Sequence, residues 1–203
     1  MRARWWWTVL IVALASVTTA AVWQATMPSR HLSAPALPRH GSVPDFSLID
    51  QRHQPVTSST LRGAPWIAAF IFTRCGGQCP IMTSRLIAIQ RALPATSPVR
   101  FVCVSVDPTY DTPDVLARYA KARGADGPQW HWLTGSWQTI SHLSRAGFHL
   151  GVEAEGGAPE EPIIHSVRLV LVDAQNRIRG YYDGTDAGVV ARMVRDIPAL
   201  SPP

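Results

Sequence analysis

The chain has 203 residues, and 19 lysines and arginines against 14 aspartates and glutamates give it a formal net charge of +5. This length allows one domain of ordinary size with a substantial core, and two domains are not expected. The positive charge comes from arginines scattered along the sequence rather than gathered in a run. We therefore expect no nucleic acid as a partner.

The N-terminus has the pattern of a membrane anchor. Arg2 and Arg4 precede an uncharged stretch, residues 5–24, which at about 1.5 Å per residue is long enough to cross the hydrocarbon core. Tryptophans lie near both ends of this stretch, at the depths where indole rings prefer to sit. We expect an uncleaved anchor, with the arginines in the cytoplasm and the rest of the chain outside it. A cleaved secretory signal is the alternative, although residues 19–21 match its cleavage site poorly.

The composition along the chain divides it into three segments. We expect residues 1–26 to form the anchor or signal, residues 27–42 a linker, and residues 43–203 one globular domain. The linker is rich in proline, serine, arginine and histidine and lacks apolar periodicity. Both alternatives for the N-terminus export the domain to an oxidising compartment, where neighbouring thiols form a disulfide unless a metal or a reductant intervenes.

The globular part alternates between strand and helix patterns. Strands are predicted from apolar runs and alternation at residues 45–50, 66–72, 99–106, 167–173 and 178–182. Helices are predicted from apolar spacing and capping residues at 80–93, 113–124, 136–146 and 189–197. A strand, helix and strand in this order form a parallel pair joined by a right-handed crossover. With the later hairpin and last helix, the order predicts a thioredoxin-like α/β fold, a central mixed sheet flanked by helices.

Two cysteines lie at the first junction between strand and helix. Cys75 and Cys79 follow the apolar run 66–72, and Pro80 marks the first turn of the next helix. The N–H groups and positive dipole end of that helix favour thiolate over thiol, and thiolate is the species that attacks disulfides and binds metals. This pair can therefore form a disulfide or hold a soft metal ion.

The spacing of this pair is longer than that of a C-x-x-C redox motif. Three residues separate the two thiols, and Gly76 and Gly77 among them let the backbone bend. The wider separation suits either a copper ion or a readily reduced disulfide. Two thiolates suit copper(I), and a third ligand with a nitrogen donor would let the same site hold copper(II).

His165 is the candidate for the third ligand, because it lies where a Gly- and Pro-rich loop meets a buried strand. An ordinary surface or core histidine is the alternative, and the residues alone leave both open. We place His131, His142 and His149 in helix or loop contexts without a matching thiol.

Five further residues near these elements need an interpretation. Asp107 follows the second parallel strand, at the edge where active-site loops gather, and can accept a hydrogen bond from a ligand or influence a thiol; a turn-forming role is the alternative. Asp111 and Thr112 have the pattern of a turn and a helix cap. Cys103 is predicted to be a buried, unpaired cysteine within a strand, and Met82 a core residue.

In their order and spacing, these motifs resemble the Sco/SenC family of membrane-anchored, thioredoxin-like copper chaperones that help to assemble cytochrome c oxidase. The resemblance spans residues 43–199. It rests on three motifs: Phe72-Thr73-Arg74-Cys75 through Cys79-Pro80, Ser105-Val106-Asp107-Pro108 with Asp111-Thr112-Pro113, and His165-Ser166 running into Val170-Leu171-Val172-Asp173 and Tyr182-Asp183-Gly184. It implies that Cys75, Cys79 and His165 bind copper and that Asp107 lies near that site.

One departure from the family is visible. Proline and aspartate commonly follow the first cysteine in the family, whereas Gly76 and Gly77 stand here. The loop should be more flexible and lacks a nearby negative charge, so its copper affinity or redox balance is expected to differ.

The resemblance implies a copper metallochaperone in a bacterial inner membrane, with a single span and its domain in the periplasm. Its expected partners are the copper-accepting subunit of cytochrome c oxidase and other copper chaperones or thiol reductants. The alternative is a thiol–disulfide reductase that keeps the cysteines of that subunit reduced, with Cys75 and Cys79 as its redox-active pair. Whether the protein is an enzyme stays open between the two. A peroxidase is disfavoured, because it needs a lone peroxidatic cysteine and this helix has a second thiol.

Overall fold

The computed structural model describes residue 23, residues 37–153 and residues 164–200. The chain divides into two compact units, Met1–Ala34 and Pro35–Pro203. Only Trp23, in helical conformation, is described in the first unit, so the predicted anchor otherwise lies outside the described residues. Among the described residues, no helix combines the length and the apolar character needed to cross a membrane.

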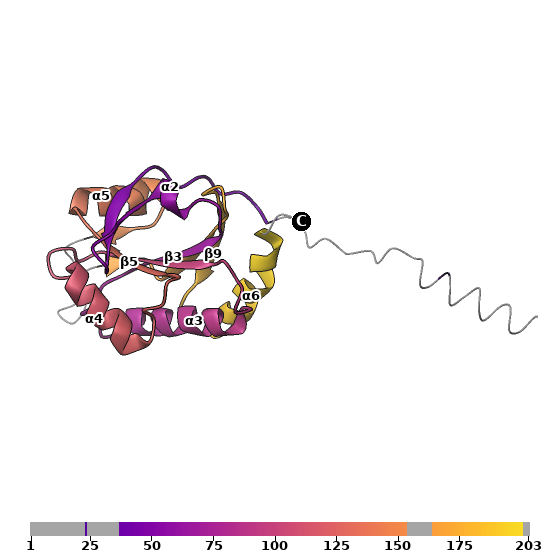
Figure 1. Ribbon diagram of the computed structural model, residues 1–203. Helices are drawn as coiled ribbons and strands as arrows, with labels where there is room; N and C mark the ends of the chain where they lie inside the picture. The colour runs from indigo at the N-terminus through magenta and orange to yellow at the C-terminus, as the bar shows by residue number, and fades with distance from the viewer. Residues whose placement is uncertain (1–22, 24–36, 154–163, 201–203) are drawn as a thin grey trace, which may run out of the picture. The chain divides into compact units, whose positions relative to one another are not determined.

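The second unit is built on a mixed sheet of seven strands in the order β2-β1-β5-β4-β3-β8-β9 (Figure 1). Its strands are β1 (Ser47–Asp50), β2 (Pro55–Thr57), β3 (Trp66–Ile71), β4 (Arg100–Ser105), β5 (Trp130–Thr134), β8 (Arg168–Val172) and β9 (Ile178–Asp183). A separate two-stranded sheet joins β6 (Val152–Glu153) to β7 (Ile164–His165) in antiparallel pairing.

The centre of the sheet agrees with the predicted topology. Strand β3 pairs parallel with β4, which pairs parallel with β5, while β8 lies antiparallel on the other side of β3 and turns back into β9. All six residues of β3 are buried, as expected of an apolar run covered on both faces. The predicted parallel pair, antiparallel hairpin and mixed sheet are confirmed.

Helices cover both faces of this sheet, as Figure 1 shows: α3 and α4 lie on one face, and α2 and α5 on the other. Their bounds are α2 (Ser58–Leu61), α3 (Gln78–Ala92), α4 (Pro113–Arg123), α5 (Trp137–His142) and α6 (Val189–Asp196), the last of which packs on α3. A π-helical turn (Leu143–Gly147) follows α5, and a 3-10 turn (Ile197–Leu200) follows α6.

Local sequence explains where α3 and α4 begin. The hydroxyl of Thr112 accepts the backbone N–H of Val115 at 3.4 Å, and Gly124 ends α4 with a φ of 66°, as its sequence predicts. Helix α3 begins at Gln78, two residues before Pro80. Proline is tolerated there, because N–H groups of a first helical turn have no partner inside the helix.

Strand β5 is an element that sequence analysis missed. His131, expected in a helix or loop, lies on this strand between Trp130 and Trp132, and both tryptophans are buried. The amide side chain of Gln51 donates to the carbonyl oxygen of Trp130 at 3.0 Å and accepts the N–H of Trp132 at 2.9 Å. These contacts come from residues far away in sequence, so the local pattern could not reveal them.

The N-terminal part of the described unit is bonded to the β8–β9 hairpin. The N–H of His40 donates to the carbonyl oxygen of Ile178 at 2.9 Å, and Ser42 forms an antiparallel bridge with Arg177. The guanidinium of Arg179 also donates to the carbonyl oxygen of Pro38 at 3.0 Å. Residues 37–42, within the segment expected to be a linker, thus lie along the edge of the sheet.

Candidate metal centre

Cys75 and Cys79 lie together where β3 leads into α3. Cys75 is in the loop after the strand and Cys79 in the first turn of the helix, and their exposed fractions are 5% and 0%. Both are thiols, as is the third cysteine, Cys103. The predicted placement of the pair at a strand-to-helix junction is confirmed.

The sulfur of Cys75 caps the start of α3. Gly77, at the N-cap position, has no side chain to accept a hydrogen bond from the first turn. Instead the Sγ of Cys75 accepts the backbone N–H of Cys79 at 3.4 Å. Since an N-cap acceptor and the positive end of a helix both favour negative charge, this position suits a sulfur that reacts or binds metal as a thiolate.

The two glycines between the cysteines leave the loop open. Gly76 and Gly77 are exposed, and a Cβ added to Gly76 would meet nothing within 4 Å. Gly77 adopts φ −106° and ψ −95°, outside the helical and extended regions. Little packing therefore surrounds Gly76, and the greater flexibility expected from the departure from the family pattern stays a prediction.

Upstream of Cys75 the loop is tied to the turn that follows β4. The backbone N–H of Thr73 donates to Oδ2 of Asp111 at 3.0 Å, and its hydroxyl donates to Oδ1 of the same carboxylate. Ser105, the last residue of β4, donates its hydroxyl to Asp111 at 2.5 Å. Burial raises the pKa of the Asp111 carboxyl, although hydrogen bonds from Ser105 and Thr73 act in the opposite direction.

Asp107 holds the next residue of the loop. Its Oδ2 accepts hydrogen bonds from Nε of Arg74 at 3.0 Å and from Nη2 at 2.5 Å, and its N–H donates to the Ser105 hydroxyl at 3.0 Å. The hydrogen bond to Asp107 raises the pKa of the Arg74 guanidinium, which also lies over the ring of Tyr110 at 4.5 Å. Asp107 thus lies at the predicted edge of the sheet, with its carboxylate against Arg74.

The backbone brings the chain after His165 to the same end of the sheet. His165 ends β7, and β8 begins three residues later, antiparallel to β3 with Leu169 opposite Ala69. The entrance to β8 therefore lies beside the carboxyl end of β3, the end that leads into the cysteine loop. The side chain of His165 lies outside the described part of the structure.

The contacts of Gly184 show that the chain after His165 lies close to α3. Its N–H donates to the carbonyl oxygen of Val167 at 2.9 Å, and a Cβ added to it would lie 2.8 Å from that oxygen and 3.0 Å from Cγ of Met82. Met82 is on α3, one turn after Cys79. The chain two residues beyond His165 therefore approaches the first turns of the helix that Cys79 opens.

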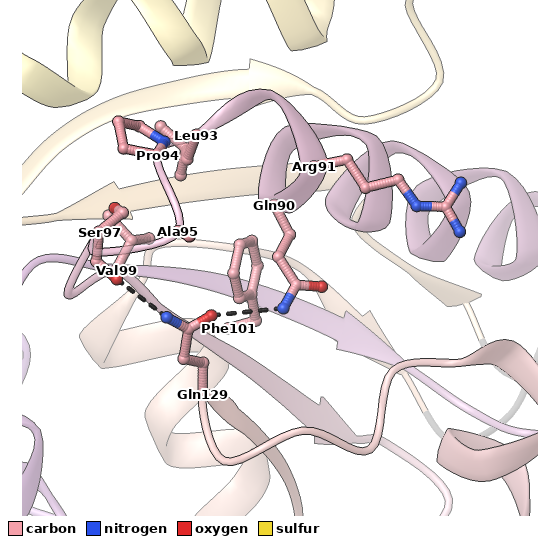
Figure 2. A pocket seen from close by; sticks show the side chains of 9 residues that line it. All are labelled: Gln90, Arg91, Leu93, Pro94, Ala95, Ser97, Val99, Phe101 and Gln129. Atoms are coloured by element: carbon pink, nitrogen blue, oxygen red, sulfur yellow. Dashed lines mark hydrogen bonds between the residues drawn. The ribbon is translucent and has the colours of Figure 1, made fainter.

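A pocket of about 310 Å³ lies elsewhere, at the far end of α3 (Figure 2). Its lining includes Gln90, Phe101 and Gln129, and the two glutamines are hydrogen-bonded to each other at 3.3 Å. Gln90 is 11 residues beyond Cys79 on the same helix, which separates the two by about 16 Å. The pocket is therefore distinct from the cysteine site.

Comparison with known proteins identifies the family. The family model for SCO1/SenC matches residues 36–200. The chain belongs to the SCO1/SenC family. This confirms the resemblance that the motifs indicated.

Individual Sco relatives match most of the chain. It is 30% identical over 166 residues to the SCO1 protein homolog of Bacillus subtilis (strain 168), covering 81% of this chain and 85% of that one. It is 33% identical over 150 residues to a protein of Stutzerimonas stutzeri whose name assigns it to copper binding, covering 71% of each.

Solved Sco structures share the thioredoxin-like fold. One of them is BsSco, described as a member of the Sco family of cytochrome c oxidase assembly proteins with a disulfide switch. It matches with a TM-score of 0.72 and 27% identity, and the match covers 81% of this chain and 96% of BsSco. ScoI of Bradyrhizobium japonicum, solved with copper bound, has a TM-score of 0.67 at 21% identity and covers 79% of this chain and 99% of its own. The second comparison shows the fold alone.

In this Sco protein, a complete metal-binding cluster is not assembled by the described side chains. Among them no group of three or more histidines, cysteines, aspartates or glutamates is arranged to hold a metal ion. The predicted set consists of Cys75, Cys79 and His165, and the described structure brings together the first two. Its ligand assignment therefore stays a prediction.

The other two sulfur-containing candidates are core residues. Cys103 and Met82 are both 0% exposed, as predicted. Burial raises the pKa of the Cys103 thiol, so this cysteine is held in its unreactive form.

Four residues of the site were missed or read only as local structure: Thr73, Arg74, Ser105 and Asp111. Asp111 was interpreted as a turn residue, yet it is fully buried and accepts hydrogen bonds from two other segments. Polar residues at or just beyond the ends of two adjacent parallel strands, Ser105 and Thr73, are the signal that could have found this network.

Proposed function

We propose that this protein is a copper metallochaperone for cytochrome c oxidase, holding one copper ion with Cys75, Cys79 and His165. The observation that carries the proposal is the 3.4 Å hydrogen bond from the N–H of Cys79 to Sγ of Cys75, which gathers two thiols at one helix N-terminus. The path of the backbone after His165, towards the end of β3 and the first turns of α3, supports the third ligand. The copper-binding and oxidase-assembly names of the relatives support the cargo and the pathway.

The donor set suits copper as a cargo that must be released. Two thiolates satisfy copper(I), and one imidazole adds the nitrogen donor that copper(II) prefers. We propose that the accepting subunit takes the ion by stepwise exchange, each incoming ligand replacing one donor of this protein. The open loop at Gly76 and Gly77 favours this exchange, because a Cβ at Gly76 would meet nothing within 4 Å and an incoming ligand can approach the pair from that side.

We also propose the arrangement of the chain in the cell. Residues 1–26 would anchor it in a bacterial inner membrane, the linker would run from residue 27 to the bonded segment 37–42, and the globular domain would face the periplasm. The support is the charge pattern of the first residues, with Arg2 and Arg4 before an uncharged stretch of membrane-spanning length.

A thiol–disulfide reductase is the second candidate, and the adjacent thiols on a thioredoxin-like fold favour it. One thiolate would attack the disulfide of the accepting subunit to form a mixed disulfide. The other would then displace the second substrate thiol, leaving Cys75 bonded to Cys79 and the substrate reduced by two electrons. An external dithiol reductant would have to restore the pair after each turn.

Copper titration of the reduced full-length protein in detergent tests the proposal. We expect one copper(I) per chain, loss of tight binding in the Cys75→Ser, Cys79→Ser double variant, and full binding in Cys103→Ser. Reduction of a disulfide-bonded peptide from the copper-accepting subunit, measured in parallel, tests the second candidate. Stoichiometric copper(I) in the double variant would refute the assignment of the site.

A further inference from the structure

The segment that carries Cys75 is fixed to the rest of the fold from its upstream side. The last residues paired in the parallel ladder of β3 and β4 are Ile71 and Ser105, so main-chain pairing between the strands ends before the cysteine loop. Beyond that point Thr73 is bonded to Asp111 through both its N–H and its hydroxyl. Side chains thus continue the link between the two strand ends.

From this arrangement we infer that Asp111 is a positioning residue for the site: acting through Thr73, it sets where the Cys75 sulfur lies relative to Cys79. The inference rests on the proposed function in one respect only, that the two thiols form the working site. Asp111 does not bind the copper. It determines the thiol–disulfide equilibrium of the pair and the geometry that the pair offers to copper(II).

Asp111 can do this because its carboxylate is itself rigidly held. The side chain is fully buried, and both of its oxygens accept hydrogen bonds. The Ser105 hydroxyl donates to Oδ2 and at the same time accepts the N–H of Asp107 at 3.0 Å. The backbone N–H of Asp111 donates to the carbonyl oxygen of Asp107 at 2.8 Å. The carboxylate is therefore fixed to the end of β4, in the centre of the sheet.

Thr73 passes this position on to Cys75 across a short distance. It lies two residues before the cysteine, and the Cys75 N–H donates to the carbonyl oxygen of Phe72 at 3.4 Å, which closes a tight turn over the residues between them. On the other side of Cys75, the open loop at Gly76 and Gly77 supplies little packing. The upstream anchor therefore carries more of the positioning than it would in a loop with bulky residues.

A second anchor is present, and it is weaker. Asp107 holds Arg74, whose side chain is 49% exposed and is attached through a long, flexible stem. On the Arg74 side, water screens the charge and ordering the long side chain costs rotamer entropy, which weakens the restraint. The buried carboxylate of Asp111 instead accepts hydrogen bonds from a backbone N–H and from a hydroxyl on a short side chain. These bonds restrict the position of the loop more strongly. Asp111 is thus the main determinant, and Asp107 supports it.

The test compares two variants that remove hydrogen bonds of this link with two that keep them. Asp111→Ala removes every acceptor, and Thr73→Val removes the hydroxyl while keeping the size of the side chain. Thr73→Ser keeps the hydroxyl, and Asp111→Asn keeps an acceptor for the Thr73 N–H while its amide can donate to the Thr73 hydroxyl. The readouts are the equilibrium of the Cys75–Cys79 disulfide with glutathione and the visible absorption of the copper(II) form, both at temperatures where circular dichroism shows a folded protein.

We expect Asp111→Ala and Thr73→Val to change the equilibrium constant with glutathione by about tenfold, which for a two-electron couple is about 30 mV. They should also shift the thiolate-to-copper(II) bands, while Thr73→Ser stays within about twofold of the wild type. A purely structural role would lower the melting temperature and leave both readouts of the folded protein unchanged, and that result overturns the inference. If Asp111→Ala does not fold, the comparison of Thr73→Val with Thr73→Ser in the same two readouts tests the inference. If the wild type binds no copper, the proposed function fails, and the glutathione equilibrium still decides the role of Asp111.

Discussion

The Sγ atom of Cys75 accepts the backbone N–H of Cys79 at 3.4 Å, so one member of the cysteine pair caps the helix that the other member opens. This links the chemistry of the sulfur to the start of α3. A hydrogen bond to an ionised acceptor is stronger than one to a neutral acceptor, so the cap strengthens when Cys75 is a thiolate. Oxidation to a disulfide or coordination of a metal replaces that charge with a bond.

The first prediction is that disulfide formation and copper binding exclude each other. A disulfide retains no thiolate to bind metal, so protein oxidised at Cys75 and Cys79 should take up no copper until it is reduced. Bound copper should in turn protect both thiols from alkylation. Thiol trapping and mass spectrometry, with and without copper, measure both effects.

Cys103 provides the internal control for that experiment, because it is 0% exposed and should stay unlabelled in folded protein in both samples. Equal labelling of Cys75 and Cys79 with and without copper would argue against a shared site and for the reductase.

The second prediction separates packing from metal binding. Cys103→Ser places a hydroxyl in the apolar core and should lower the free energy of unfolding by about 1–3 kcal/mol. Copper stoichiometry should not change, since Cys103 lies within β4 and pairs with Ala69 inside β3, before the cysteine loop begins. Urea unfolding and copper titration measure the two effects. Cys103→Ala, which adds no polar group, is the matched control and should be less destabilising than Cys103→Ser. A loss of copper in both variants would bring Cys103 into the site.

The third prediction concerns stability at acid pH. Burial of Asp173 acts to raise the pKa of its carboxyl, but backbone and side-chain hydrogen bonds from Arg177 and a side-chain bond from Arg179 lower it overall. A carboxyl with a lowered folded-state pKa stabilises the fold above its ordinary pKa of about 3.9, and that stabilisation is lost as pH falls through the folded value. Asp173→Asn should therefore lower stability at pH 7 by about 1–3 kcal/mol and flatten the loss of stability below pH 4.

Urea unfolding at pH 7, 5 and 3 measures this difference. The difference in stability between the wild type and the Asp173→Asn variant should narrow as the pH falls from 5 to 3. A constant difference between them across this range would mean that the carboxylate charge contributes nothing. Asp186→Asn is the control, because that carboxyl is exposed and its salt bridge to Arg192 is at the surface.

Some of this fold is encoded locally and some is not. The apolar runs of β3, β4 and β8 and the capping of α4 by Thr112, Pro113 and Gly124 are strong local signals, and their elements were predicted within one or two residues. Strand β5 was missed, because its pairing with β4 and the side chain of Gln51 stabilise it from a distance.

The site shows the same division. The cysteine pair could be predicted because its two residues and the strand and helix around them are consecutive. The role of Asp111 could not be predicted, because its partner Thr73 lies 38 residues away in the sequence. The local sequence pattern of a turn-forming aspartate is also the same whether its carboxylate faces water or Thr73. Only the folded sheet brings the two strand ends together and buries the carboxyl.

The last prediction concerns the proposed third ligand. Replacing His165 with alanine should weaken copper(II) far more than copper(I), because two thiolates satisfy copper(I) whereas copper(II) prefers additional nitrogen donors in a tetragonal arrangement. The thiolate-to-copper(II) absorption bands should disappear or shift, and copper(I) should still bind at one ion per chain. Competition with chelators for each oxidation state, together with visible spectra, measures the difference.

His142→Ala is the control for this variant, because His142 is an exposed residue of α5, a helix on the face of the sheet away from α3 (Figure 1). It should bind both oxidation states as the wild type does. Thermal melting should show that both variants are folded, so that a loss of copper(II) in His165→Ala reflects a lost donor. Unchanged affinities and spectra in folded His165→Ala would remove this residue from the ligand set. The two cysteines would then be left as a copper(I) site or a redox pair, and the glutathione equilibrium and copper(I) titration distinguish these two roles.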